Sequence, residues 1–182
     1  MNKLNIGCGP KPLAGWINID CRAMPGVDVV CDLNSFPWQF SDNSADEILA
    51  SHVIEHLDDP LAAIMEMRRI LKPGGKMTIK VPHVLGPFAM TIGHYHYFGS
   101  AWFRCLEGHD GMQNDPGTGL FSEASLRMNL FPVGLNFTFI PQLLIATWER
   151  FFNRSPIRQI LWETLGMLHP GEIVWVATKK GE

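Results

Sequence analysis

The sequence predicts an α/β protein built around an open, mainly parallel β-sheet. Three observations indicate it: a short apolar run that ends in glycine stands near the amino terminus, strand-like and helical segments follow in alternation, and the carboxyl-terminal part is rich in β-branched residues. In such sheets, ligands bind beyond the carboxyl ends of the strands. With 182 residues, we expect a single domain over residues 1–182.

The first part of the chain predicts four strands. Apolar and β-branched residues recur in four short segments: KLNI (3–6), WINIDC (16–21), VDVVCDL (27–33) and the start of ADEILASHVI (45–54), which ends in a turn.

The connection between the first two predicted strands is short. Only CGPKPLAG, with two prolines, separates them. A parallel crossover normally needs about a dozen residues. We therefore predict a turn, and no three-turn helix, at residues 9–15.

A helix is predicted next. Asp58 or Asp59 can cap its amino terminus, and Pro60 suits its first turn. Its apolar residues recur at helical spacing, namely Leu61, Ile64, Met67 and Leu71. KPGG (72–75) is expected to stop the helix before a fifth strand, KMTIKVPH (76–83).

The second half is less regular. Residues 84–120 show no period and are rich in glycine, histidine and aromatic residues, which is typical of a lid-like insertion. A helix is expected to start near Ser122, with Glu123 in its first turn, and LNFTFI (135–140) to form a sixth strand. TWERFFNRSPIRQILWETLGML (147–168) predicts helix broken near its proline, and EIVWVATKK (172–180) predicts the last strand.

Composition excludes several classes of protein. A net charge of −3 offers no general attraction for nucleic acid. The four cysteines form no CxxC pair, so neither a zinc ribbon nor a disulfide scaffold is indicated, and we expect reduced thiols in a cytoplasmic protein. The segment 128–148 carries no charge, but prolines and polar residues interrupt it, which favours a buried strand with flanking turns over a membrane span.

The glycines after the first strand do not match the common phosphate-binding motifs. A dinucleotide fingerprint fails because Pro12 stands at its third glycine and because Asp20 follows Gly7 by 13 residues, where roughly 20 are expected. No G-K-S/T follows, so a P-loop fails as well. The remaining interpretation is a tight turn at Gly7 and Gly9 that lets the backbone approach a small molecule.

Two carboxylates extend this interpretation. Asp20 ends the second predicted strand and can accept hydrogen bonds from a ribose diol, and Asp32 ends the third and can accept from an exocyclic amine beside Leu33. Each residue alone fits an ordinary strand end equally well. Their coincidence at successive strand ends favours a nucleoside site.

The segments LNIGCG, GWINID, VDVVCDL, FPWQFSDNSADEILASHVIEHL and EMRRILKPGGKMTIKVP resemble the class I S-adenosylmethionine-dependent methyltransferases of the small methyltransferase-11-like group, over residues 4–83. The resemblance implies a Rossmann-like, seven-stranded sheet ordered 3-2-1-4-5-7-6 with an antiparallel last strand. In this sequence the first crossover helix is reduced to a turn. Part of the pocket wall is then missing, and we expect the segment after His83 or a second subunit, as in a homodimer, to close it.

The resemblance also implies site residues for S-adenosylmethionine and its product S-adenosylhomocysteine. The cofactor would lie against Gly7, Cys8 and Gly9 (methionine part), Asp20 (ribose), Asp32 and Leu33 (adenine), and Ser51, His52 and Val53 (opposite side). Glu55 and His56 match the family's E-H-L and are expected to be structural. Glu66 and Arg69 can pair at i,i+3, although a solvated face is the favoured interpretation.

Three histidines are candidates for a catalytic base, should the acceptor be a hydroxyl: His83 first, at the end of a strand, then His94 and His96 in GHYHYFG. Each alone also fits a structural role. A metal on His94 and His96, with His109 or Asp110, is a weaker alternative because i,i+2 side chains share a face only on a strand. We expect no metal.

These observations lead to competing functions. The first is methyl transfer to a small-molecule acceptor, such as a sugar or a lipid-linked compound. The second is a non-catalytic module that binds the cofactor or stabilises a partner enzyme. A third, metal-dependent hydrolysis on the lid histidines, is weaker. Arg150, Arg154 and Arg158 among bulky apolar residues could contact a membrane surface, although a helix packed on the sheet is favoured.

Overall fold

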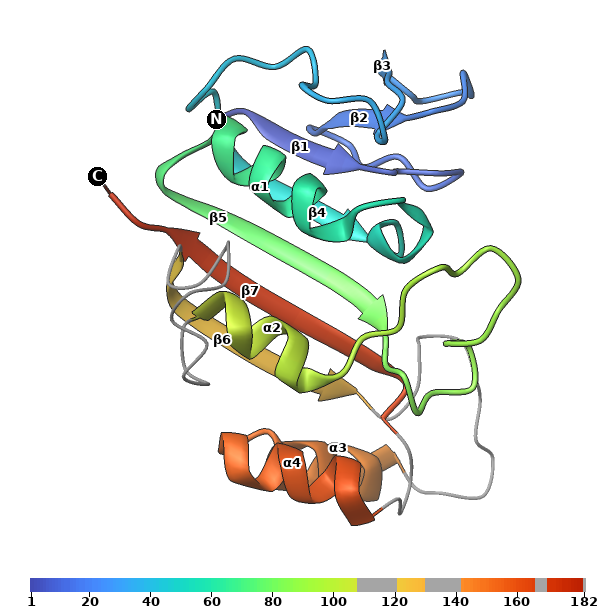
Figure 1. Cartoon of the computed structure of the whole chain (residues 1–182), viewed down its shortest axis with the longest axis vertical. Coiled ribbons are helices and arrows are strands. Elements are labelled where there is room, and N and C mark those ends of the chain that lie inside the picture. The colour runs from blue at the N-terminus through green and yellow to red at the C-terminus, as the bar shows by residue number, and fades with distance from the viewer. Residues whose placement is uncertain (108–120, 130–141, 166–169, 182) are drawn as a thin grey trace.

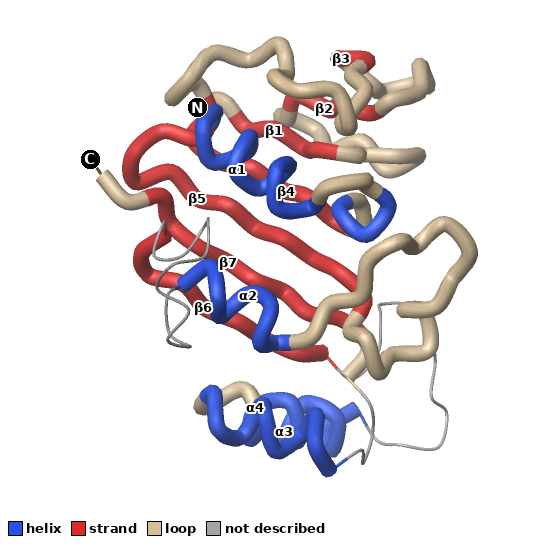
Figure 2. Tube along the Cα trace, viewed as in Figure 1, coloured by secondary structure: helices blue, strands red, loops and turns tan. Residues whose placement is uncertain are grey.

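The computed structural model describes residues 1–107, 121–129, 142–165 and 170–181. Its strands form one seven-stranded sheet in the order β3-β2-β1-β4-β5-β7-β6 (Figure 2). The strands are β1 Lys3–Ile6, β2 Ile17–Asp20, β3 Val29–Val30, β4 Ala45–Ser51, β5 Leu71–Pro82, β6 Phe121–Asn129 and β7 Glu172–Lys179. The helices are η1 Ile54–His56 (3₁₀), α1 Pro60–Ile70, α2 Ser100–Glu107, α3 Gln142–Phe152 and α4 Pro156–Leu165.

The pairing confirms the predicted sheet. β1 lies parallel to β2 and to β4, and β5 lies parallel to β4. β7 runs antiparallel to both of its neighbours, β5 and β6. The carboxyl ends of β1, β2 and β4 therefore meet at one edge of the sheet, which is where ligands bind in folds of this kind.

Helices α1 and α2 lie on the same face of the sheet (Figure 1). Residues of β7 that point to this face are fully buried, as Trp175 shows, whereas its neighbours Val174 and Val176 are only half-buried. Phe103 of α2 and Phe121 of β6 pack their rings on Trp175 at centroid distances of 5.6 and 5.1 Å. This aromatic group joins α2 to the far half of the sheet.

The crossover from β1 to β2 contains no helix, as predicted, and the side chain of Asn18 holds it in place. The Asn18 carboxamide oxygen accepts from the Leu13 N–H at 2.7 Å, and its amino group donates to the Leu13 carbonyl at 3.1 Å. The same oxygen accepts from the buried side chain of Asn5 on β1 at 2.9 Å. One buried amide thus supplies the hydrogen bonds that a crossover helix would otherwise make internally.

The helix predicted to start near Ser122 is wrong: these residues belong to β6. From Ala124 to Met128 exposure alternates: Ser125 and Arg127 are exposed, while the residues on either side of them are half-buried or buried, as is typical of a strand. β6 pairs with β7 over its whole length, with one irregularity between Ser122 and Ser125. Pairing between distant segments outweighed the local signal of a polar residue followed by an acidic one. The predicted strand at 135–140 lies outside the described residues.

Other elements differ from prediction mainly in their bounds. α1 ends at Ile70, and Leu71 already has extended backbone, so KPGG lies within β5 and does not cap the helix. The third strand is reduced to Val29–Val30 because Asp32 starts a turn, in which its carboxylate accepts from the Asn34 N–H at 3.0 Å. The predicted break near Pro156 is confirmed by the separation of α3 from α4.

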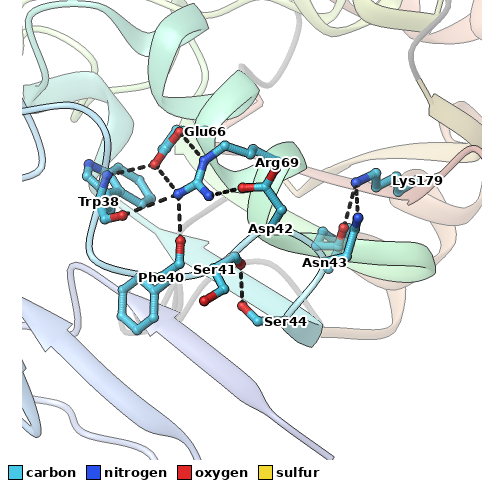
Figure 3. Close-up of polar contacts among 10 residues, drawn as sticks. Trp38, Phe40, Ser41, Asp42, Asn43, Ser44, Glu66, Arg69 and Lys179 are labelled. Atoms are coloured by element: carbon cyan, nitrogen blue, oxygen red, sulfur yellow. Dashed lines mark hydrogen bonds and ion pairs between the residues drawn. The ribbon is translucent and has the colours of Figure 1, made fainter.

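Glu66 and Arg69 do pair, but the favoured solvated face is wrong (Figure 3). Glu66 is buried, and both of its oxygens accept from the Arg69 guanidinium, at 2.7 and 2.9 Å. Arg69 also donates to the carbonyls of Trp38 and Phe40 at 3.2 and 2.8 Å and pairs with Asp42. Arg69 therefore ties the irregular segment before β4 to helix α1.

No helix within the described ranges is long and apolar enough to cross a bilayer. The segment 84–99 has no regular element apart from a bridge between His83 and Phe98. The residues 108–120, which the lid prediction includes, lie outside the described part of the chain.

Candidate functional site

A cavity of about 380 Å³ opens at the edge where β1, β2 and β4 end. Residues from four stretches of the chain, at or after the ends of β1, β2, β3 and β4, surround it. They are Gly7, Gly9, Asp20, Cys21, Arg22, Asp32, Leu33, Asn34, His52, Val53, His56 and Leu57. The glycines and carboxylates that the sequence places at successive strand ends therefore line one cavity.

Gly7 and Gly9 shape the floor of the cavity. Both have positive φ, +64° and +51°, a conformation that favours glycine. A Cβ on Gly7 would lie 2.3 Å from Cγ2 of Val53, so the backbone here is in direct contact with the turn after β4. A Cβ on Gly9 would meet no described atom within 4 Å. The chain at Gly9 therefore borders open space.

Asp20 is the carboxylate best placed to hold a ligand in this cavity. It is 6% exposed, and its oxygens accept from the Gly9 N–H at 2.8 Å and the Arg22 N–H at 3.1 Å. Burial raises the pKa of Asp20, but these backbone hydrogen bonds outweigh it and hold the pKa below its ordinary value. Among the described residues, Oδ2 accepts only from Gly9, and the second donor to Oδ1 is the weak Cys21 thiol at 3.6 Å, so Asp20 can still accept from a hydroxyl pair.

Asp32 and Leu33 also line the cavity. The Asp32 carboxylate is exposed and accepts from the Ser35 hydroxyl at 2.8 Å, and this hydrogen bond lowers its pKa. Leu33 is 5% exposed and presents an apolar surface to the cavity. A flat aromatic ring with a polar edge would match a wall of this composition.

His52 brings a cation to the cavity lining. Its Nε2 lies 2.9 Å from Glu172 Oε1 in a hydrogen bond, and its Nδ1 lies 3.5 Å from Glu55 Oε1, an ion-pair distance without hydrogen-bond geometry. The hydrogen bond to Glu172, aided by Glu55, raises the pKa of His52 to about 9. The ring is therefore protonated at neutral pH. Its backbone φ of +54° turns the chain so that Val53 packs over Gly7.

The structure does not bring every predicted residue to the cavity. Cys8 is buried beside it, and Ser51 is half-buried at the end of β4, but neither is among the lining residues. Sequence reasoning missed five that are: Cys21, Arg22, Asn34 and Leu57 were not considered, and His56 was taken as structural. The available signal was adjacency, since each of the five lies within four residues of a predicted one.

The candidate bases lie in different places. His83 is fully buried; its Nε2 donates to Glu163 at 2.8 Å and its Nδ1 accepts from the Leu85 N–H at 3.1 Å. Both ring nitrogens are thus engaged, and His83 does not line the cavity. Its partner is 80 residues away in the sequence and could not be inferred from it.

His94 and His96 belong to a segment that packs on the turn after β4. The Tyr95 N–H donates to the Glu55 carbonyl at 2.9 Å, and His96 Nε2 lies 3.2 Å from the Asp58 carbonyl. His94 contacts the ring of His56 edge-on at 4.7 Å between centroids. The segment after His83 therefore reaches the residues that line the cavity, but none of its described residues lines the cavity itself.

Comparison with known proteins agrees with this geometry. Residues 4–79 match the model of the methyltransferase domain family. An uncharacterized methyltransferase of Mycobacteroides abscessus is 38% identical over 86 residues, which are 44% of this chain and 33% of that protein. A demethylmenaquinone methyltransferase of Renibacterium salmoninarum is 32% identical over 84 residues, 44% of this chain and 35% of that one. The chain spans between a third and a half of the length of the curated relatives it matches.

Solved structures share the fold. A SAM-dependent methyltransferase from Archaeoglobus fulgidus superposes with a TM-score of 0.61 at 15% identity, covering 98% of this chain and 86% of that one. A Haemonchus contortus phosphoethanolamine N-methyltransferase 2, in complex with phosphomonomethylethanolamine and S-adenosylhomocysteine, gives 0.60 at 16% identity, covering 99% of this chain and 49% of that one. The predicted Rossmann-like fold, with its strand order 3-2-1-4-5-7-6, is confirmed.

Proposed function

We propose that this chain, which carries a methyltransferase domain of the class I fold, binds S-adenosylmethionine and transfers its methyl group to a small-molecule acceptor. The observation that supports this most is the cavity at the ends of β1, β2 and β4, where two positive-φ glycines face a buried carboxylate. A nucleoside needs both groups: close backbone approach and an acceptor pair for its ribose.

The residues present fit the cofactor. Asp20 would accept from the ribose diol, and Leu33 and Asp32 would cover the adenine face and its amino group. The open space over Gly9 would take the methionine part. The bound cofactor supplies a sulfonium whose methyl group is already electrophilic, so the chain's own task is to orient the two reactants and exclude water.

The acceptor would approach from the side of His56. His94 contacts this wall through the ring of His56, whereas His83 has both ring nitrogens engaged elsewhere, so this side of the cavity does not depend on His83. A small-molecule acceptor is supported by the similar proteins whose printed descriptions state a small molecule, demethylmenaquinone and phosphomonomethylethanolamine.

None of the four cysteines, all within the described residues, forms a disulfide, which fits a reducing compartment such as the cytoplasm.

Ligand-induced stabilisation tests the cofactor site. S-adenosylhomocysteine at about 100 times its dissociation constant should add about 2.7 kcal/mol to the free energy of unfolding. For a domain of this size, that corresponds to a rise of roughly 5–11 °C in melting temperature. Asp20→Ala should lose most of the rise.

Asp58→Ala is the matched control. It also removes an acidic side chain, but Asp58 is exposed and lies outside the cavity lining. It should keep the full rise. A wild-type protein whose melting temperature ignores the ligand, or an Asp20→Ala variant that keeps the rise, would refute the cofactor assignment.

A non-catalytic module is the second candidate. The crossover without a helix favours it, because one wall of the usual pocket is absent from the described residues. Incubation with methyl-labelled cofactor and a metabolite extract separates the two functions: labelled product indicates an enzyme, and a ligand-stabilised protein that labels nothing indicates a module.

A further inference from the structure

Glu55, in the turn after β4, is a buried carboxylate whose charge lacks hydrogen-bond partners. Its side chain is 1% exposed, and neither oxygen has a hydrogen-bond partner among the described residues. The nearest charge is His52 Nδ1 at 3.5 Å from Oε1. Burying a carboxylate without hydrogen bonds is costly, and buried charges are usually paired or coordinate metals. This residue therefore requires an explanation that the cofactor site does not supply.

Two histidines complete a cluster around this carboxylate. One nitrogen of His56, one nitrogen of His94 and a carboxylate oxygen of Glu55 lie within 4.8 Å of one another. The three residues come from two separate segments, which the hydrogen bonds of Tyr95 and His96 to the Glu55 carbonyl hold together.

The hydrogen bonds of the two rings prepare them as metal ligands. Nδ1 of His56 lies 2.7 Å from the Gly93 carbonyl, and Nδ1 of His94 lies 3.0 Å from the Ala89 carbonyl. A carbonyl only accepts, so each Nδ1 must carry the proton, and in the neutral ring Nε2 keeps its lone pair. Metal-bound histidines characteristically donate their other ring N–H to a backbone carbonyl in this way.

We propose that Glu55, His56 and His94 bind a divalent transition-metal ion. Two imidazoles and one carboxylate suit zinc, which catalytic sites hold with three protein ligands and leave open at a fourth position. Mg²⁺ prefers an all-oxygen shell and is not expected to compete. The inference goes beyond the proposed function, since such an ion could bind whether or not the cofactor does.

The geometry needs only a small adjustment. With ligand bonds of about 2.0–2.2 Å, neighbouring ligands of a tetrahedral zinc ion lie about 3.3 Å apart. Atoms that are at most 4.8 Å apart would therefore approach by about 1.5 Å or less. Because His56 also lines the cofactor cavity, the ion would stand at the cavity wall.

This site differs from the metal site considered from the sequence. That alternative used His94 and His96 together with His109 or Asp110. In the structure, Nε2 of His96 lies 3.2 Å from the Asp58 carbonyl and His96 is not part of the cluster, while residues 109 and 110 lie outside the described part of the chain. The expectation of no metal rested on that pair alone.

The competing explanation is that Glu55 serves only as a counter-ion for His52. His52 has a closer partner, however, in Glu172 at 2.9 Å. His52 therefore keeps a carboxylate when Glu55 turns to a metal. The two explanations give different results in metal titrations.

Zinc titration of the full chain tests the proposal. The tag-free protein is treated with a chelator, dialysed and titrated with ZnCl₂ by calorimetry, and its bound zinc is then measured by mass spectrometry. We expect one zinc per chain. Glu55→Gln and His94→Ala should each weaken zinc affinity at least about 10-fold, and circular dichroism checks that both variants are folded.

His96→Ala is the matched control, because it removes a histidine two positions from His94 that lies outside the cluster. Its zinc affinity should stay within about threefold of wild type. Asp20→Ala, which probes the cofactor site, should also bind zinc normally, so either proposal can fail alone. A wild-type chain that binds no stoichiometric zinc, or a His96→Ala loss equal to that of His94→Ala, overturns the metal site.

Discussion

Replacement of Gly7 by alanine probes the contact that closes the cavity floor. The new Cβ would lie 2.3 Å from Val53 Cγ2 and 2.6 Å from its Cβ, in a residue with φ of +64°. The left-handed backbone costs about 1–2 kcal/mol for alanine. Overpacking against the buried valine adds about 1–3 kcal/mol. We therefore expect Gly7→Ala to lower the free energy of unfolding by about 2–5 kcal/mol.

Gly9→Ala separates the two contributions. Gly9 has a similar φ of +51°, but an added Cβ there would meet no described atom within 4 Å. Gly9→Ala should therefore lower the free energy of unfolding only by the cost of the left-handed backbone, about 1–2 kcal/mol. Urea unfolding of both variants without ligand, followed by circular dichroism, measures the difference directly.

A double-mutant cycle with Val53→Ala identifies the clashing partner. The Val53→Ala change removes the contact at 2.3 Å but leaves the one at 2.6 Å, so it should recover part of the Gly7→Ala penalty, with a coupling energy of at least about 0.5 kcal/mol. Equal costs for the two glycine variants, or a cycle without coupling, would show that Val53 does not limit the floor of the cavity.

Three further predictions concern the supports of the site. Asn18→Ala should destabilise the protein by about 2–4 kcal/mol in urea unfolding, because it leaves buried polar groups of the β1–β2 crossover without partners. Arg69 holds the pKa of Glu66 below its ordinary value, so Glu66 stabilises the fold above its unfolded pKa and loses this effect as pH falls through the folded pKa. The difference in stability between wild type and Glu66→Gln should therefore be constant near neutral pH and shrink as pH falls below about 4.3. Glu163→Ala, which leaves the buried His83 without its acceptor, should cost about 2–4 kcal/mol in thermal unfolding yet keep the stabilisation by S-adenosylhomocysteine.

The sequence was most informative where local pattern and tertiary role agree. The strands β1, β2, β4 and β7 and the helix α1 follow from apolar runs and capping residues that act over a few positions. Asp20 was predicted for the same reason: it ends a short apolar strand, and strand ends of a parallel sheet form the binding edge.

The sequence-based predictions failed where contacts with residues far away in the chain determine the structure. β6 was taken for a helix because its pairing with β7 involves residues about 50 positions away, which no local pattern reveals. Burial of Glu66 depends on an irregular segment about 28 residues earlier, which supplies the Trp38 N–H. The two histidines that surround Glu55 likewise come together only after residues 93–96 pack on the turn following β4.

The single amide that secures the first crossover also fixes how long that segment can be. A helix can gain or lose a turn and still present the same face to its sheet, since its hydrogen bonds repeat along the axis. The stretch between β1 and β2 has no repeat, because the backbone of Leu13 must stand opposite Asn18. One inserted or deleted residue there would move the Leu13 N–H and carbonyl out of hydrogen-bond distance of the Asn18 side chain. Relatives that share this connection should therefore also share its length.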